Sequence, residues 1–187
     1  MATTIAIDHT PLRATAHSAT HKIDLSALLG LVITTGLPLA LFGLVHLVAE
    51  TLGIVPYFFS PFGLNGWVGA ALHIALLPML GASLFLVASE QNTSPIAWLV
   101  ALIAGLIIFP FIIAPLDSLQ LGMATTGLLL LTIATMMRVS AVSRPAAYLL
   151  TPALVWLAVS ATLGLALAAS WAPPFALTQV HNAPPAA

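Results

Sequence analysis

The chain has 187 residues, of which 60% are hydrophobic and only 5% carry a formal charge, with a net charge of -1 and no cysteine. A soluble domain is roughly 45–50% apolar and about 25% charged, so this composition excludes an ordinary soluble globular protein. The charge balance lacks the basic excess of a nucleic-acid-binding protein, and the missing cysteines exclude disulfides, thiolate metal sites and Fe–S clusters. We therefore expect a polytopic membrane protein.

Residues 1–23 form a polar segment that contains His9, His17 and His21 but no apolar stretch. A secretory signal would need a hydrophobic region of about 7–15 residues, so we expect a mobile N-terminal tail. The spacing of the three histidines is a poor match to the spacing of metal ligands, and no metal site is predicted here.

Five apolar runs follow, at 25–48, 67–88, 96–113, 119–137 and 146–170. A helix that spans the bilayer needs about 20 mostly apolar residues, and none of the runs alternates as a strand would. Backbone groups at bilayer depth must be satisfied within their own segment, which favours helices. We predict an all-α bundle of five transmembrane helices within residues 24–171, followed by a C-terminal tail at 172–187.

The cationic residues indicate how this bundle is oriented. Arg13 and Lys22 precede the first span, while Arg138 and Arg144 lie between the fourth and the fifth, which places all four on one side. By the positive-inside rule this side faces the cytoplasm. We expect an integral protein of a bacterial inner membrane, with the N-terminus in the cytoplasm and the C-terminus on the opposite side. The lipid bilayer is its expected partner, and nucleic acid is not.

Three ionisable side chains fall in the predicted spans: His46 and Glu50, four residues apart in the first, and His73 in the second. Ionisable groups at bilayer depth are costly and are therefore functional candidates. Together they suit a metal site, a haem or chlorin ligand set, or a proton relay. In the alternative interpretation, Glu50 lies at the interface and hydrogen-bonds His46, while His73 bonds a backbone carbonyl. One histidine per helix falls short of a bis-histidine haem site, which favours the alternative.

Aromatic and proline residues indicate an internal pocket. The loop after the first span and the start of the second hold a group of aromatic residues: Tyr57, Phe58, Phe59, Phe62 and Trp67. Such a group is typical of an interfacial belt, but a proline-rich aromatic loop also suits a lid over a cavity. Trp156 lies deep in the fifth span, where its indole N–H needs a partner, so we expect it to contact a ligand. Four spans each hold one proline, which loosens the packing nearby: Pro38, Pro78, Pro110 and Pro152.

The junction between the fourth and fifth spans carries a motif. The family pattern S-R-x-A-x-W-L-L-x-P-Y-x-x-W is matched by Ser143, Arg144, Ala146, Leu149, Leu150, Pro152 and Trp156, with Tyr148 in place of a Trp. In this motif the chain resembles the translocator protein family (TspO, tryptophan-rich sensory protein). Residues 109–111, Phe-Pro-Phe, are similar to the W-S-P-L-F-F motif of that family's third helix. The resemblance covers residues 56–170 and is most specific at 143–156.

The resemblance implies a five-helix bundle, often a homodimer, that binds porphyrin-, sterol- or carotenoid-like ligands beneath the first loop. The chain departs from the family pattern in the third helix, where Gly105 replaces an Asn and Ile108 a Trp. The first loop also lacks the family's Trp, so we expect a divergent member.

We predict a membrane-embedded binding or regulatory protein for a hydrophobic ligand such as a porphyrin. The sequence contains no G-x-S-x-G, Walker-type or H-E-x-x-H motif and no paired carboxylates in a span, so we expect neither an enzyme nor a metal site. An aromatic lining with few polar groups suits a flat apolar ligand. The predicted lining is Tyr57, Phe59, Trp67, His73, Phe109, Tyr148 and Trp156.

Two other hypotheses remain open. In one, the protein is a structural or accessory subunit of a larger membrane complex, packed against partner helices, pigments or lipids. In the other, His46 or His73 ligates a haem or another pigment.

Overall fold

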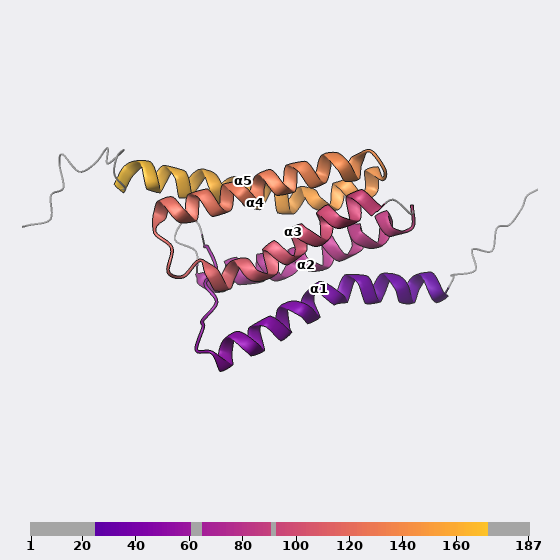
Figure 1. The fold of residues 1–187 in the computed structure, drawn as a ribbon, viewed down its shortest axis with the longest axis horizontal. Helices are drawn as coiled ribbons and strands as arrows, with labels where there is room; N and C mark the ends of the chain where they lie inside the picture. Colours follow the sequence, from indigo (N-terminus) through magenta and orange to yellow (C-terminus); the bar gives the residue numbers. More distant parts are fainter. Residues whose placement is uncertain (1–24, 61–64, 91–92, 172–187) are drawn as a thin grey trace, which may run out of the picture.

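The computed structural model describes residues 25–60, 65–90 and 93–171, which form five helices and no strand. The helices are α1 (Leu25–Thr51), α2 (Gly66–Ala88), α3 (Thr93–Ile112), α4 (Ser118–Ser140) and α5 (Arg144–Trp171) (Figure 1). All five are long and apolar enough to cross a membrane, and their ends differ from the predicted spans by at most three residues. The predicted five-helix membrane fold is thereby confirmed. The predicted tails at 1–23 and 172–187, with their histidines, lie outside the described residues.

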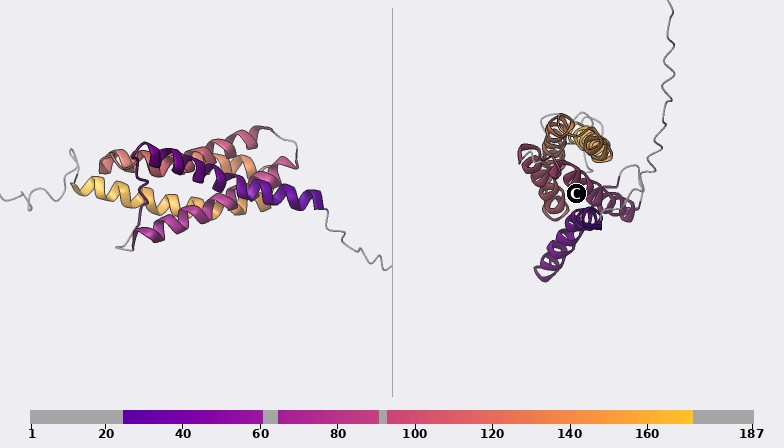
Figure 2. Two further views of the ribbon diagram at one scale, coloured as in Figure 1. Left: turned by 90° about the horizontal axis from the view of Figure 1, so that it is seen from below. Right: turned by 90° about the vertical axis from the view of Figure 1, so that its right-hand side faces the viewer.

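The helices pack side by side in a ring. Helix α1 contacts α2, α2 contacts α5, and α5 packs along α4, which is the most extensive contact of the bundle. Helix α4 then contacts α3, and α3 returns to both α2 and α1. Seen along the bundle axis, the second half of α1 projects away from the other four helices (Figure 2). Helix α1 is therefore the least enclosed element.

Local signals in the sequence set two of the helix ends. Helix α4 begins at a capping box, in which Asp117 Oδ1 accepts the Gln120 N–H at 2.7 Å and Gln120 Oε1 accepts the Asp117 N–H at 3.2 Å. These bonds satisfy N–H groups that a helix start leaves unpaired. After α1, Gly53 adopts a left-handed φ of 69°, a conformation that glycine adopts without the strain of a Cβ atom.

Two glycines allow the closest crossings between helices. A Cβ atom on Gly122 of α4 would lie 3.3 Å from the carbonyl carbon of Gly164 in α5. A Cβ atom on Gly81 of α2 would fall on the carbonyl oxygen of Thr34 in α1. Small residues let backbones approach in this way where lipid provides no hydrophobic drive for helix association.

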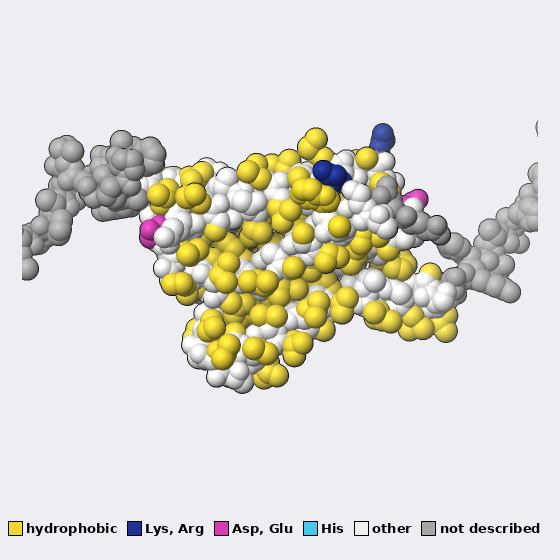
Figure 3. Space-filling model, viewed as in Figure 1, with side chains coloured by type: hydrophobic (Ala, Val, Ile, Leu, Met, Phe, Trp, Pro, Cys, Tyr) yellow, Lys and Arg dark blue, Asp and Glu magenta, His cyan; other side chains and the backbone are white. Residues whose placement is uncertain are grey.

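The interior of the bundle is leucine-rich and the exterior is also apolar. Leu77, Leu80, Leu102 and Leu150 are completely buried. On the face shown in Figure 3, hydrophobic side chains cover much of the surface, and α1 contributes many exposed hydrophobic residues. An apolar surface is what a bilayer requires of a protein that spans it.

Polar contacts join helices of the bundle both at a helix end and in the interior. In the last turn of α4, the Arg138 guanidinium carbon lies 4.4 Å from the centroid of the Trp98 ring. This contact combines a cation–π interaction with a favourable position at a helix C-terminus. Between α2 and α5, the buried Ser83 hydroxyl donates to the carbonyl oxygen of Ala146 at 3.0 Å.

Candidate functional site

The loop at 52–60 folds over the end of α3 and is fixed to two helices. The Tyr57 N–H donates to the carbonyl oxygen of Pro110 at 2.8 Å. The Ser60 hydroxyl accepts the N–H of Gly69 at 3.2 Å, and this N–H belongs to the first turn of α2, where intrahelical partners are lacking. A Cβ atom on Gly69 would fall on the carbonyl oxygen of Phe59, so only glycine lets the loop approach this closely.

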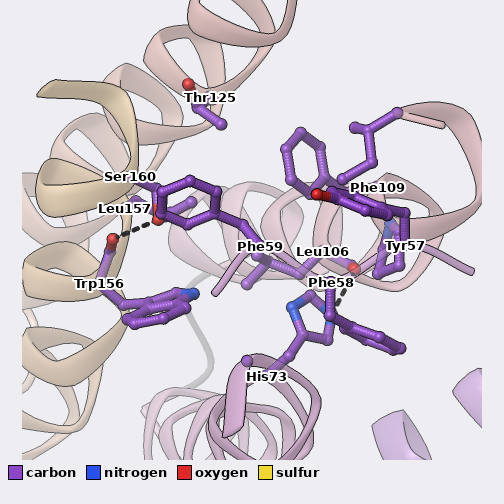
Figure 4. A pocket seen from close by; sticks show the side chains of 13 residues that line it. Tyr57, Phe58, Phe59, His73, Leu106, Phe109, Thr125, Trp156, Leu157 and Ser160 are labelled. Atoms are coloured by element: carbon purple, nitrogen blue, oxygen red, sulfur yellow. Dashed lines mark hydrogen bonds between the residues drawn. The ribbon is translucent and has the colours of Figure 1, made fainter. Parts of the chain in front are cut away.

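Beneath this loop lies a cavity between α2, α3, α4 and α5 (Figure 4). Aromatic side chains dominate its lining, and polar side chains contribute at a few places. The lining consists of Tyr57, Phe58, Phe59, Gly69, His73, Leu106, Phe109, Pro110, Ile113, Thr125, Trp156, Leu157 and Ser160.

The cavity is small in this state. The space open to the centre of a water molecule is about 20 Å³, and about 10–15 Å³ suffices for one water molecule. The ring of Phe59 occupies the middle of the site, with its centroid 6.3 Å from that of Trp156. The protein's own side chains therefore fill most of the interior, and the Phe59 ring is one of them.

His73 is buried and bonds across the bundle. Its Nε2 lies 2.9 Å from the carbonyl oxygen of Leu106 in α3. In an uninterrupted helix that oxygen would accept the N–H of residue 110, but residue 110 is proline and has none. His73 therefore satisfies the carbonyl that Pro110 leaves unpaired, and it fixes α2 to α3 at this level.

This bond determines what His73 presents to the cavity. Since Nε2 donates to a carbonyl, Nδ1 is an acceptor in the neutral imidazole. Figure 4 shows this second nitrogen on the side of the ring that faces Phe59 and Trp156. The Trp156 indole N–H lies across the site, and among the described residues it has no hydrogen-bond partner. The cavity thus holds one free donor and one free acceptor.

A cluster of rings closes the cavity on the α1 side. Phe42 lies 5.9 Å from His73 and 5.6 Å from Phe111, and Phe58 lies 5.6 Å from His73, all between ring centroids. His46, on the exposed side of this cluster, stacks on Phe42 at 6.5 Å. Edge-to-face and offset ring contacts of this kind add about 0.5–1.5 kcal/mol each to the burial itself.

The interpretation of the three ionisable residues can now be tested. The bond of His73 to a backbone carbonyl is as the alternative interpretation predicts. The predicted bond between His46 and Glu50 is wrong: the structure has no hydrogen bond between these two exposed residues of α1, and the His46 ring packs on Phe42 instead. Within the described ranges, no three His, Asp or Glu side chains come together as a metal site would require.

The structure brings together five of the seven predicted lining residues: Tyr57, Phe59, His73, Phe109 and Trp156. The other two lie elsewhere. Trp67 is 68% exposed at the start of α2, and Tyr148 is 71% exposed on the outside of α5, two turns from Trp156.

Several lining residues were missed by the sequence analysis. The helical spacing of i, i+3, i+4 and i+7 from Leu106 to Ile113 would have indicated the face that α3 turns to the cavity. The same spacing connects Trp156 to Ser160 in α5. Phe58 and Thr125 carry no such signal.

The fold and the site define an integral membrane protein of five helices with an aromatic-lined cavity beneath its first loop. The model of the TspO/MBR family matches residues 58–170, which is more than half of the chain. The chain belongs to this family. No curated protein and no solved structure matches it significantly. The matched segment contains α2 to α5 and all of the cavity lining except Tyr57.

Proposed function

We propose that this protein is a non-enzymatic binding or regulatory protein for a flat hydrophobic ligand of the porphyrin, sterol or carotenoid kind. The observation that carries the proposal is the convergence of aromatic side chains on one internal cavity, with the Trp156 N–H and His73 Nδ1 both facing it. Ligand sites are mostly apolar and use a few polar groups to orient the ligand. Family membership supports the same function.

The size of the cavity determines how a ligand would enter. A volume of about 20 Å³ does not admit a macrocycle or a sterol, so Phe59 must leave its place beside Trp156. The loop that carries Phe59 is held by single hydrogen bonds to α3 and α2. Such bonds are worth about 0.5–1.5 kcal/mol each, which a buried ligand of this size offsets easily.

The chemistry of the lining supports binding rather than catalysis. No carboxylate lines the cavity: of the acidic residues in the described ranges, Glu50, Glu90 and Asp117 all lie at helix ends. The Thr125 and Ser160 hydroxyls donate to carbonyls of their own helices, so neither is activated by a base. The residues present can orient a ligand but lack the acid–base pairs of common hydrolytic sites.

Quenching of tryptophan fluorescence by protoporphyrin in detergent tests the proposal. We expect saturable quenching that decreases strongly in Trp156→Phe. Trp67→Phe is the matched control, because Trp67 lies in the same half of the bundle but outside the cavity, and it should leave the saturable part unchanged. Quenching without saturation, or equal loss in both variants, would refute binding in this cavity.

A second candidate is a structural or accessory subunit of a larger membrane complex. The observation that favours it is the exposed apolar face of α1, where Val32, Ile33 and Leu44 are each about 60% exposed. Purification from native membranes in mild detergent distinguishes the two candidates. Partner chains in stoichiometric amount would favour the subunit, whereas a single species of this chain would favour the binding protein.

We also propose that the protein lies in the inner membrane of a bacterium, with its N-terminus in the cytoplasm. The basis is the position of the arginines: Arg138 lies in the last turn of α4 and Arg144 begins α5, at the same end of the bundle as the start of α1 (Figure 1). Because the chain has no cysteine, single cysteines can be introduced at residue 2 and residue 186 without a background. A membrane-impermeant thiol reagent added to intact cells should label the second position only. Labelling of the first would reverse the orientation.

A further inference from the structure

A groove follows the outside of the α4–α5 pair, away from the internal cavity. The part of the groove next to the turn between α4 and α5, called the upper part, is lined by Met136 and Ser140 of α4 and by Arg144, Ala147 and Tyr148 of α5. It measures about 370 Å³. The lower part measures about 270 Å³ and shares Met136 and Ser140 with the upper. Because the two parts share these residues, they lie next to each other along α4.

The lower part is apolar and faces the acyl region of the membrane. Apart from the shared Ser140, its lining consists of Ile133, Met136, Met137 and Leu154. Methionine side chains are flexible and adapt to irregular chains, as an acyl tail requires. The Ser140 hydroxyl is already committed, since it donates to the carbonyl oxygen of Met137 at 2.9 Å.

The upper part holds a cation without a counterion. Within the described ranges no carboxylate forms an ion pair with Arg144, which is exposed in the first turn of α5. Tyr148, one helical turn further on and 71% exposed, lies on the same side of the groove. Arginine binds phosphate oxygens in a bidentate manner, and tyrosine is typical of the level of lipid headgroups.

The length of the groove matches one leaflet. Arg144 and Leu154 are ten residues apart, which at 1.5 Å per residue corresponds to about 15 Å along α5. The hydrocarbon core of a bilayer is about 30 Å thick, so one leaflet contributes about 15 Å. A molecule with a phosphate at Arg144, in the headgroup layer, and a chain along Ile133 and Leu154 would therefore extend through most of one leaflet.

We propose that this groove binds one anionic phospholipid, with its phosphate on Arg144 and an acyl chain along the methionine-lined surface between α4 and α5. A zwitterionic lipid offers the same phosphate, but its own ammonium group compensates the charge. One arginine near a membrane surface is worth about 1 kcal/mol toward anionic lipid, which corresponds to about five-fold in occupancy. The site is independent of the internal cavity and of the function proposed for it.

Native mass spectrometry of the full chain in detergent, with added dioleoylphosphatidylglycerol or dioleoylphosphatidylcholine, tests this proposal. We expect the first complex of the wild-type chain to favour phosphatidylglycerol about five-fold. Arg144→Gln should remove this preference. The matched control is Arg138→Gln, which deletes the same charge at the same end of the bundle, but from a side chain that stacks on Trp98 outside the groove. It should keep the preference.

Ser140→Phe addresses the acyl part, because Ser140 is exposed where the two parts of the groove meet. It should lower the occupancy of both lipids while the circular dichroism spectrum stays unchanged.

Equal losses in Arg144→Gln and Arg138→Gln, no effect of Ser140→Phe, or equal binding of both lipids by the wild type would each overturn the proposal. A dimer that Arg144→Gln dissociates would show instead that a second copy covers the groove. Quenching of tryptophan fluorescence by porphyrin should be the same in all these variants. Failure of the lipid proposal would therefore leave the proposal for the internal cavity unaffected.

Discussion

The bond between His73 and the carbonyl oxygen of Leu106 leads to a quantitative prediction. His73→Phe keeps an aromatic ring beside Phe42 and Phe58 but removes the N–H that donates at 2.9 Å. The carbonyl then has no partner, because Pro110 has no N–H to offer it. An unsatisfied buried carbonyl costs about 1–3 kcal/mol in soluble proteins. Side-chain hydrogen bonds in a membrane protein average about 0.6 kcal/mol with a maximum of about 1.7. Since this carbonyl lacks any intrahelical alternative, we expect a value near that maximum, about 1.5 kcal/mol.

A double-mutant cycle separates this bond from general packing. In Pro110→Ala the backbone N–H of residue 110 is restored and can bond the Leu106 oxygen within α3. In that background His73→Phe should cost less than about 0.5 kcal/mol, so the coupling free energy between the two sites is about 1 kcal/mol. The measurement is the unfolding free energy in mixed micelles as dodecyl sulfate is added, followed by circular dichroism.

The control for this cycle is His46→Phe, the same chemical change at an exposed histidine of α1. It should change the unfolding free energy by less than about 0.5 kcal/mol in both backgrounds, as exposed substitutions do. If His73→Phe costs the same with and without Pro110, the bond does not compensate the proline, and the reasoning is refuted.

Three further predictions concern the packing of the helices. Gly81→Ala should destabilise the bundle by about 1–3 kcal/mol, because its Cβ would meet the Thr34 carbonyl oxygen. Gly43→Ala, which has open space around it, should be neutral in the same micelle titration. Ser83→Ala should cost only about 0.6 kcal/mol by that assay, because the carbonyl it bonds in α5 keeps a helical N–H partner. Asp117→Ala removes the capping box of α4 and should lower the unfolding free energy by about 1 kcal/mol, with an Asn substitution at the same position restoring most of it.

The fold was predictable from the sequence because bilayer depth imposes a simple rule on length and polarity. Each apolar run ends at residues that form turns, and the helices end within three residues of those runs. The capping box at Asp117 and Gln120 could also have been recognised from the sequence. What the apolar runs do not contain is the direction in which each helix faces, since helices that are apolar all round give no stripe to orient.

That missing information explains which of the predicted residues line the cavity and which do not. His73 lies in the interior because an imidazole inside a membrane needs a polar partner, which the Leu106 carbonyl provides, and Trp156 faces the same cavity. Tyr148 was included on the strength of a motif, but eight residues separate it from Trp156, or about 12 Å along α5. It therefore lies near the other end of the bundle, where the groove with Arg144 begins.

Helix α2 contacts the carbonyl oxygens that two prolines, Pro38 and Pro110, leave without an intrahelical partner. Pro38 leaves the Thr34 carbonyl of α1 without its intrahelical partner, and Pro110 does the same to Leu106 in α3. Helix α2 meets both oxygens: the Cα–H side of Gly81 packs on the first, and the Nε2–H of His73 bonds the second. Prolines in transmembrane helices are tolerated where neighbours satisfy the freed carbonyls in this way. Both interrupted helices are thus held against the same neighbour, α2, and at Pro110 the interruption lies in the lining of the cavity.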